Sequence, residues 1–181
     1  APPENLDYSN AIWRYARGLA MANMDDINGA QAERAKLAAV KDSVQIRFLD
    51  SADYPASLLL NIADDLLQGE IALKSDNPDL AASHFERAVE KQDSLPYMEP
   101  PFWYYPTRQS LGQALLEAGR FAEAEAVYRK DLEDYPRNGW SMSGLATALE
   151  RQGKMDEAKE ARNAFALIWA KADVEINGSR L

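Results

Sequence analysis

The feature that most constrains the fold is a recurrence of residue types 34 positions apart in the second half of the chain. A glycine, a large apolar residue and an alanine each return after this interval, at Gly119 and Gly153, Phe121 and Met155, and Ala124 and Ala158. Such a period is typical of two helices joined by a turn and repeated along the chain. Each pair leaves an apolar face that only its neighbour can cover, so the recurrence predicts a stack of helix pairs.

The repeat is less regular at its two ends. Tyr128 and Pro136 are followed 34 residues later by Arg162 and Ala170, which makes the final repeat less typical. An earlier copy is indicated by residues of the same types at Gly69, Ala72, Asp76, Ala81, Phe85 and Ala88. A fainter copy is indicated by Gly18, Met21, Ala30 and Leu37. We expect small residues such as Ala124 where paired helices cross, because close packing requires them.

Apolar residues at helical spacing extend this prediction to the whole chain. The predicted helix pairs cover about 9–42, 57–92, 106–135 and 139–173, with linkers at about 43–56 and 93–105. No segment alternates between apolar and polar residues as a strand would. The predicted fold class is therefore all-α, an α-α superhelix of about four antiparallel helix pairs. A chain of 181 residues suits a single domain, here 1–181.

The repeat pattern resembles a known family. The residues Leu111-Gly112, Gly119, Ala124, Tyr128 and Pro136 are similar to the pattern of the tetratricopeptide repeat. The resemblance covers about three quarters of the chain. At a finer level, the segments at 15–20, 68–72, 99–112 and 129–149 resemble the C-terminal repeats of larger, mostly uncharacterised bacterial proteins of this family. The resemblance implies a solenoid fold and says little about the ligand.

Composition excludes several classes of partner. The formal net charge is −9 and the chain has no run of Lys or Arg, so we expect no nucleic-acid binding. No apolar run approaches about 20 residues, so we expect no membrane span. The chain has no cysteine, which excludes disulfides and thiolate chemistry. We expect a soluble protein, and its compartment stays open between cytoplasm and periplasm.

The residues that carry catalytic or metal chemistry are sparse. His84 is the single histidine, and we interpret it as a surface or half-buried side chain. The acidic clusters Asp25-Asp26, Asp64-Asp65 and Asp131/Glu133/Asp134 lack the spacing of a calcium loop, and we interpret them as solvated helix ends. We therefore predict no enzyme, no metal and no cofactor.

An aromatic and proline-rich stretch separates the second predicted pair from the third. Its prolines, Pro96, Pro100, Pro101 and Pro106, forbid a continuous helix. Two interpretations of Phe102, Trp103, Tyr104 and Tyr105 stay open. The rings either wedge into the packing as a corner, or one or two of them remain exposed and clamp a peptide, sugar or partner helix.

The family resemblance also implies which residues face a partner. In tetratricopeptide proteins the first helix of each pair lines the concave side of the stack. Candidate groove or partner-binding residues are Tyr15, Glu70, Trp103, Tyr105, Arg108, Gln109, Gln113 and Trp140. Arg108 offers a planar fork for a carboxylate of a partner, although an internal ion pair with Glu70 is an equal alternative.

The leading functional prediction is a non-catalytic scaffold that binds an unidentified protein or peptide in the concave groove. The alternative is a structural or self-associating segment of a longer repeat protein with no separate ligand. An enzyme is the third reading. A homodimer, or contact with upstream repeats, fits either of the first two.

The last predicted helix has more large apolar residues than one helical face can bury. It carries Phe165, Leu167, Ile168 and Trp169, and one helical face cannot hide all four. We predict that the following segment folds back, with Val174 and Ile176 packing on Trp169. A second copy of the chain is the alternative cover.

Overall fold

The computed structural model describes residues 2–3, 5–176 and 178–179. Within this part of the chain, every regular element is an α-helix, which confirms the all-α prediction. The helices form two compact units, Ala1–Tyr105 and Pro106–Leu181. In each unit, consecutive helices pack as antiparallel pairs, as a tetratricopeptide-like solenoid requires.

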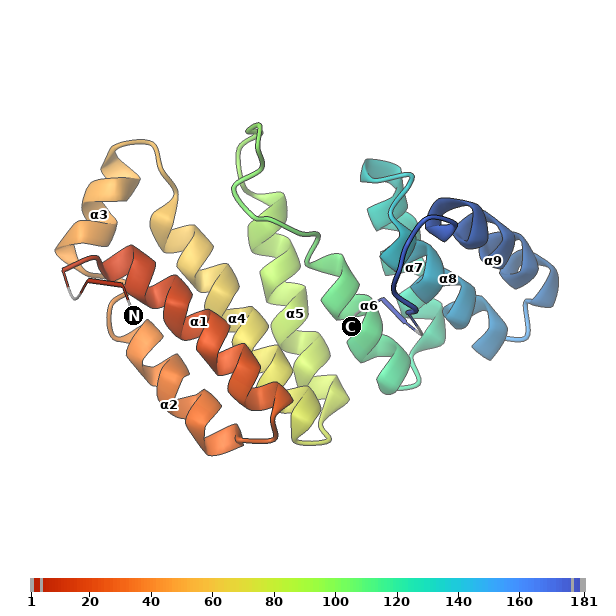
Figure 1. The fold of residues 1–181 in the computed structure, drawn as a ribbon, viewed down its shortest axis with the longest axis horizontal. Helices are drawn as coiled ribbons and strands as arrows, with labels where there is room; N and C mark the ends of the chain where they lie inside the picture. Colours follow the sequence, from red (N-terminus) through yellow and green to blue (C-terminus); the bar gives the residue numbers. More distant parts are fainter. Residues whose placement is uncertain (1, 4, 177, 180–181) are drawn as a thin grey trace. The chain divides into compact units, whose positions relative to one another are not determined.

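The first unit contains two helix pairs and one short helix (Figure 1). Helix α1 (Asp7–Asn23) pairs with α2 (Ile27–Ala38), and α4 (Ala56–Lys74) pairs with α5 (Pro78–Asp93). Helix α4 also packs against α1 and α2, so it is the centre of this unit. Helix α3 (Val44–Ser51) contacts α1 and α4.

Helix α3 lies where the sequence pattern predicted a linker. The Ser43 hydroxyl caps it by accepting a hydrogen bond from the backbone N–H of Ile46 at 3.3 Å. The Ile46 side chain is fully buried and fixes the helix to its neighbours. A helix of eight residues is shorter than the roughly 11–18 residues over which a helical period is recognised in sequence, which explains why it was not predicted.

The second unit contains the other two pairs. Helix α6 (Arg108–Glu117) pairs with α7 (Phe121–Asp134), and α8 (Gly139–Arg151) pairs with α9 (Met155–Trp169). Helix α8 also contacts both α6 and α7, which joins the two pairs into one layer. These bounds lie close to the predicted pairs, since Gly, Asn and Pro mark the ends of helices directly.

The turn inside each helix pair uses the same backbone device. One residue of each turn adopts a positive φ: Asp25 at 62°, Asp76 at 57°, Gly119 at 75° and Gly153 at 76°. Glycine and aspartate tolerate this left-handed conformation better than other residues. Asp26 and Asn77 then cap the next helix, with their side chains accepting from the N–H of Gly29 at 2.9 Å and of Leu80 at 3.2 Å. The turns predicted from sequence are therefore the turns that the chain forms.

Aromatic rings packed against glycines set the spacing between helices. The ring of Tyr128 on α7 is fully buried, and a Cβ added at Gly112 on α6 or at Gly144 on α8 would lie 2.3 Å from its Cζ. In the first unit, a Cβ at Gly69 would lie 2.3 Å from Cε1 of Phe85. Ala124 is also fully buried on α7, as expected of a small residue in the helix interface. Any larger side chain at these glycines would push the helices apart.

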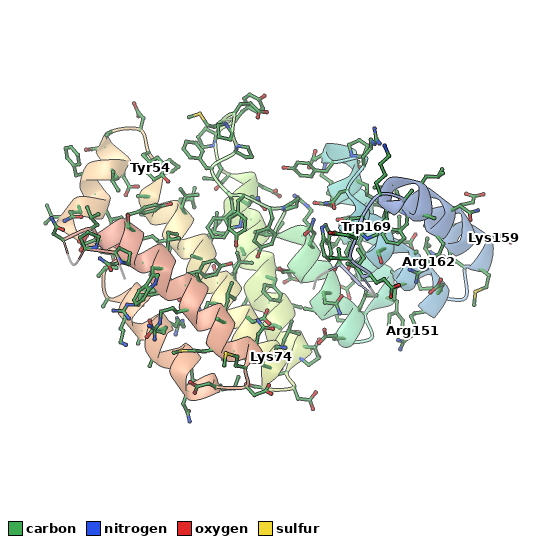
Figure 2. All side chains as sticks on the ribbon, viewed as in Figure 1. Tyr54, Lys74, Arg151, Lys159, Arg162 and Trp169 are labelled. Atoms are coloured by element: carbon green, nitrogen blue, oxygen red, sulfur yellow. The ribbon has the colours of Figure 1, made fainter. Side chains whose placement is uncertain are left out.

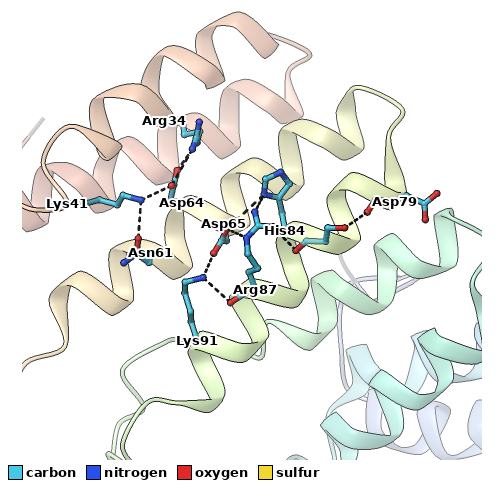
Figure 3. A network of polar contacts seen from close by, with 10 residues as sticks. Arg34, Lys41, Asn61, Asp64, Asp65, Asp79, His84, Arg87 and Lys91 are labelled. Carbon is cyan, nitrogen blue, oxygen red and sulfur yellow. Dashed lines mark hydrogen bonds and ion pairs between the residues drawn. The ribbon is translucent and has the colours of Figure 1, made fainter.

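Two adjacent carboxylates lie buried in the middle of α4. Asp64 and Asp65 are only 5% and 6% exposed, so their interpretation as a solvated helix end is wrong. The Asp64 carboxylate accepts from Arg34 Nε of α2 at 2.8 Å and from Lys41 Nζ at 2.9 Å (Figure 3). These partners compensate the cost of taking the charge out of water.

The second of these carboxylates points to the other side of α4. Asp65 accepts from Arg87 Nε at 3.0 Å and from Lys91 Nζ at 2.7 Å, both on α5 (Figure 3). His84 Nδ1 lies 3.9 Å from Asp65 and also contacts Arg87. Burial, and then the charge of Arg87, lower the pKa of His84, so the imidazole is neutral at pH 7. The lone histidine is therefore half-buried and part of the helix packing.

A third buried carboxylate joins α7 to α8. Asp131 is fully buried, so the interpretation of its cluster as a solvated helix end is wrong for this residue. It accepts hydrogen bonds from Asn138 Nδ2 at 2.9 Å and from the Ser141 hydroxyl. Asn138 also caps α8 by accepting from the N–H of Trp140 at 3.1 Å. Burial raises the pKa of Asp131 in spite of the two hydrogen bonds.

Glu125 connects α7 to the turn between α8 and α9. Its carboxylate accepts from Lys154 Nζ at 2.6 Å, from Gln152 Nε2 at 2.8 Å and from Arg129 Nε at 2.9 Å. Burial acts to raise its pKa, but these three hydrogen bonds outweigh burial and lower the pKa from 4.5 to about 2. The ionised form is therefore stabilised by the fold.

We predict that Glu125→Gln lowers the free energy of unfolding at pH 7 by roughly 1.5 kcal/mol, near the lower end for charged hydrogen bonds because its partners are partly exposed. A carboxylate with a lowered pKa stabilises the fold above its unfolded pKa and loses that effect as pH falls through its folded pKa. The difference between variant and wild type should therefore shrink between about pH 4.5 and pH 2. Urea unfolding at several pH values measures it. Glu133→Gln, at an exposed site, is the matched control, and a pH-independent difference would contradict the assignment.

Candidate functional site

An apolar pocket in the first unit is the strongest candidate for a binding site. It has a volume of about 430 Å³. One wall is a face of α1, and the other is the aromatic segment that follows α5. Its lining side chains are predominantly aromatic and aliphatic: Tyr8, Ser9, Ile12, Trp13, Tyr15, Ala16, Phe102, Trp103 and Tyr104. Pockets of this size and composition are typical of sites that bind small molecules or single side chains.

Prolines and one hydrogen bond hold the aromatic segment in place. Pro96, Pro100 and Pro101 prevent α5 from continuing, so the chain leaves the helix in an irregular path. Gln92 Nε2 on α5 donates to the carbonyl of Tyr105 at 3.0 Å and ties the far end of the segment to the helix. The rings between these points are thereby brought against α1.

Trp103 forms the floor of the pocket. Its side chain is 5% exposed, and its ring centroid lies 5.8 Å from that of Tyr15, which is 3% exposed. The rings of Tyr104 and Tyr105 lie 5.4 and 6.3 Å from Trp103. Tyr104 itself is 72% exposed and forms the rim. Trp103 thus packs as a corner and Tyr104 stays exposed, while a clamping role for an exposed ring stays a prediction.

One polar atom at the floor of the pocket is buried without a partner. Trp103 Nε1 has no hydrogen-bond partner in the part of the chain that the structure describes. Burial, and then the nearby Tyr105 and Tyr104 hydroxyls, raise the pKa of Tyr15 well above its ordinary value, so it remains a neutral phenol. A buried donor without an acceptor costs free energy. The polar groups at the floor of the pocket are therefore less completely hydrogen-bonded than those of an ordinary protein core.

Further contacts support the pocket from both sides. Tyr54, labelled in Figure 2, donates its hydroxyl hydrogen to the Tyr8 hydroxyl at 2.9 Å, and its ring packs edge-on against Phe102 at 5.7 Å. On the other side, the guanidinium groups of Arg14 and Arg17 lie 4.5 and 4.7 Å from the ring centroid of Trp13. The pocket therefore has an aromatic support at one side and cationic groups at the other.

The predicted partner-binding residues fall into both units. Tyr15, Trp103 and Tyr105 come together in the first unit, with Tyr105 partly exposed. Glu70 is in the same unit but is buried on α4 at 2% exposure. The remaining four belong to the second unit: Arg108, Gln109, Gln113 and Trp140. Their role in binding stays a prediction.

In the second unit the predicted residues have defined neighbours. Gln109 and Gln113 lie on α6 and contact Ser179, at the far end of the chain. Trp140 on α8 packs edge-on against Trp169 of α9, with centroids 5.4 Å apart. Gln113 Nε2 also donates to Glu117 at 3.0 Å. The side chains of Gln113 and Trp140 therefore already have intramolecular contacts, while Gln109 contacts Ser179 through its backbone carbonyl.

Apart from Tyr15, the α1 residues that line the pocket were not predicted from sequence. Tyr8, Ile12 and Tyr15 recur at spacings of four and three residues, which places them on one helical face. Trp13 lies beside this face. The spacing was visible, but it is equally typical of a core-facing stripe, and only the structure shows that the aromatic segment meets it.

A second pocket of about 480 Å³ lies between α2, α4 and α5 and is more polar, with Gln31, Arg34, Gln68, Asn77 and His84 among its lining residues. No group of three or more His, Cys, Asp or Glu able to hold a metal ion occurs among the described residues. In the same part of the chain, no helix has the length and apolar character needed to cross a membrane.

The paired helices, left-handed turns and glycine-to-ring contacts define a helical-repeat protein. Residues 115–164, which reach from the end of α6 into α9, match the tetratricopeptide repeat family. This segment of the chain is a tetratricopeptide repeat, as its sequence pattern predicted. The finer resemblance to bacterial repeat proteins stays a prediction.

A curated relative is Protein POLLENLESS 3-LIKE 2 of Arabidopsis thaliana, which is 45% identical over 51 residues. The match covers 28% of this chain and 12% of the plant protein, so it concerns a small part of that relative. No solved structure matches the chain significantly.

We predict that Trp103→Ala lowers the free energy of unfolding by about 3–5 kcal/mol, because a buried indole is removed from the floor of the pocket. Trp103→Phe should cost much less, since it keeps most of the ring and loses a donor that has no partner. Tyr97→Ala, at an 87% exposed position of the same segment, is the control. Urea unfolding measures all three. Equal stability of Trp103→Ala and wild type would show that the ring does not support the packing.

Proposed function

We propose that the chain is a non-catalytic scaffold that binds a segment of a protein or peptide, with the aromatic pocket as its main anchor site. The observation that carries the proposal is the pocket itself, in which a rigid aromatic floor lies beneath an exposed tyrosine at the rim. Tetratricopeptide repeats typically bind proteins, and the match at residues 115–164 supports this class of function.

The chemistry of the pocket favours one kind of anchor. A volume of about 430 Å³ suits a single large apolar or aromatic side chain of an extended segment. Arg17, beside Trp13, already pairs with Glu33 at 3.7 Å, so its charge does not call for an acidic residue of a ligand. We therefore propose a ligand segment with an aromatic or aliphatic anchor.

Within this proposal the predicted residues have different roles. Tyr15 and Trp103 form the floor of the pocket and keep it open. Tyr105 supports the ring of Tyr104, which lies above them. Tyr104, which the sequence analysis did not select, contacts the ligand directly. Glu70, Arg108, Gln109, Gln113 and Trp140 stay candidates for contacts with a longer partner.

The second candidate function is a structural segment whose inner face is occupied by its own chain. The contacts of Ser179 with Gln109 and Gln113 favour it for the second unit. They do not involve the aromatic pocket, so the two functions are compatible within one chain.

Selection of peptides from a random phage-displayed library tests the proposal. We expect selected peptides to share an apolar anchor, and Tyr104→Ala to weaken their binding about tenfold or more, equivalent to about 1.4 kcal/mol. Tyr97→Ala is the matched control, because Tyr97 is exposed on the same segment but does not line the pocket. Isothermal titration calorimetry measures both. Peptides that bind wild type and Tyr104→Ala equally would contradict the use of this pocket.

A further inference from the structure

The segment after α9 folds back over the second unit. We call its described residues, 170–176 and 178–179, the tail. Trp169 Nε1 donates to the carbonyl of Val174 at 2.7 Å and turns the chain (Figure 2). Ile176 is 9% exposed and Ser179 only 1% exposed. The predicted fold-back occurs, but Val174 contacts Trp169 through its carbonyl and is itself 46% exposed. The packing of Ile176 on Trp169 stays a prediction.

Ser179 occupies a specific polar subsite on α6 and α7. Its hydroxyl donates to the carbonyl of Gln109 at 2.8 Å. Since a serine hydroxyl has one proton, the Tyr128 hydroxyl is the donor in the 2.7 Å contact between the two side chains. The backbone N–H of Ser179 points to Gln113 Oε1 at 3.4 Å. The hydroxyl and the backbone N–H of Ser179 thus each have an acceptor on α6.

The position of Tyr128 explains why the subsite exists. Its ring comes from α7 and lies between Gly112 of α6 and Gly144 of α8. Because both positions lack a side chain, the phenol passes between the two helices and its hydroxyl reaches the tail on their other side. The contact that packs the repeat therefore also presents a hydrogen-bond donor to the surface where the tail lies.

The residue before Ser179 is restricted by the same face. A Cβ added at Gly178 would lie 2.7 Å from Gln113 Oε1, so a side chain there requires Gln113 to move. Ile176, two residues earlier, is buried. The tail thus presents an apolar residue, then a glycine, then a serine whose hydroxyl is fully buried.

We propose that this face of the second unit is a recognition site for an extended peptide segment containing a glycine-serine pair, and that the tail occupies it as an intramolecular ligand. The proposal rests on the proposed function only in assigning peptide binding to this chain, because it uses none of the residues of the aromatic pocket. A second segment with the same chemistry, from another copy of this chain or from another protein, can bind only after the tail has left the site.

The tail has an advantage over any segment in solution. It is linked to α9 by a few residues, and a short flexible link gives an effective concentration in the millimolar range. A free peptide with the same contacts therefore competes poorly with the intact tail. Weakening the tail without altering the helices should open the site.

The test uses the full chain and an acetylated, amidated peptide with the sequence of residues 173–181. Gly178→Val in the chain should push Gln113 Oε1 away from the Ser179 N–H and so weaken the hold of the second unit on the tail. We expect the peptide, added to millimolar concentration, to shift the amide NMR signals of α6 and α7 in Gly178→Val and to bind wild type at least tenfold more weakly. Ser179→Ala in the chain is a second variant that should free the site, because it removes the hydroxyl that bonds to Gln109 and Tyr128.

Two peptide controls make the result specific. The same peptide with valine at position 178, or with alanine at position 179, should bind the opened chain at least tenfold more weakly. The proposal is overturned if the peptide binds neither variant, binds wild type and variants equally, or binds no better than its two controls. Peptides selected for the aromatic pocket should bind Gly178→Val and wild type alike, which separates failure of this proposal from failure of the proposed function.

Discussion

The packing of an aromatic ring against helical glycines is the constraint on which each unit depends. Tyr128 lies between Gly112 and Gly144, and Phe85 lies against Gly69. A helix can approach its neighbour this closely only where no side chain stands at the contact. The distance between helices then determines which groups face each other elsewhere. The buried hydrogen bonds and the surface subsites both follow from that distance.

The two units use this common architecture differently. In the first unit, α1 and the segment after α5 leave an aromatic pocket open, with a rim at Tyr104. In the second unit, the gap between the glycines lets a buried phenol reach the surface, where Ser179 accepts its hydrogen bond. A repeat fold therefore fixes where helices lie, while insertions and tails decide which surface is available to a ligand.

Sequence patterns predicted those features that depend on local rules. The helix pairs and their turns followed from glycine, asparagine and proline positions, because capping and φ preferences act over a few residues. The burial of Asp64, Asp65 and Asp131 was not predicted, since it depends on cations and polar donors that other helices supply. Apart from Tyr15, the α1 wall of the pocket was missed for a similar reason. A stripe of apolar residues is the same in sequence whether a core or an open pocket covers it.

The stability of Gly144→Ala shows whether the fold requires glycine against the Tyr128 ring. Alanine is the better helix former by about 1 kcal/mol, so without the ring the substitution should stabilise the chain. With the ring in place we expect Gly144→Ala to lower the free energy of unfolding in urea, because overpacking costs about 1–3 kcal/mol. In a Tyr128→Leu background, where the ring is absent, Gly144→Ala should become neutral or stabilising. If Gly144→Ala raised the stability of wild type and of Tyr128→Leu by the same amount, the fold would not require glycine against this ring.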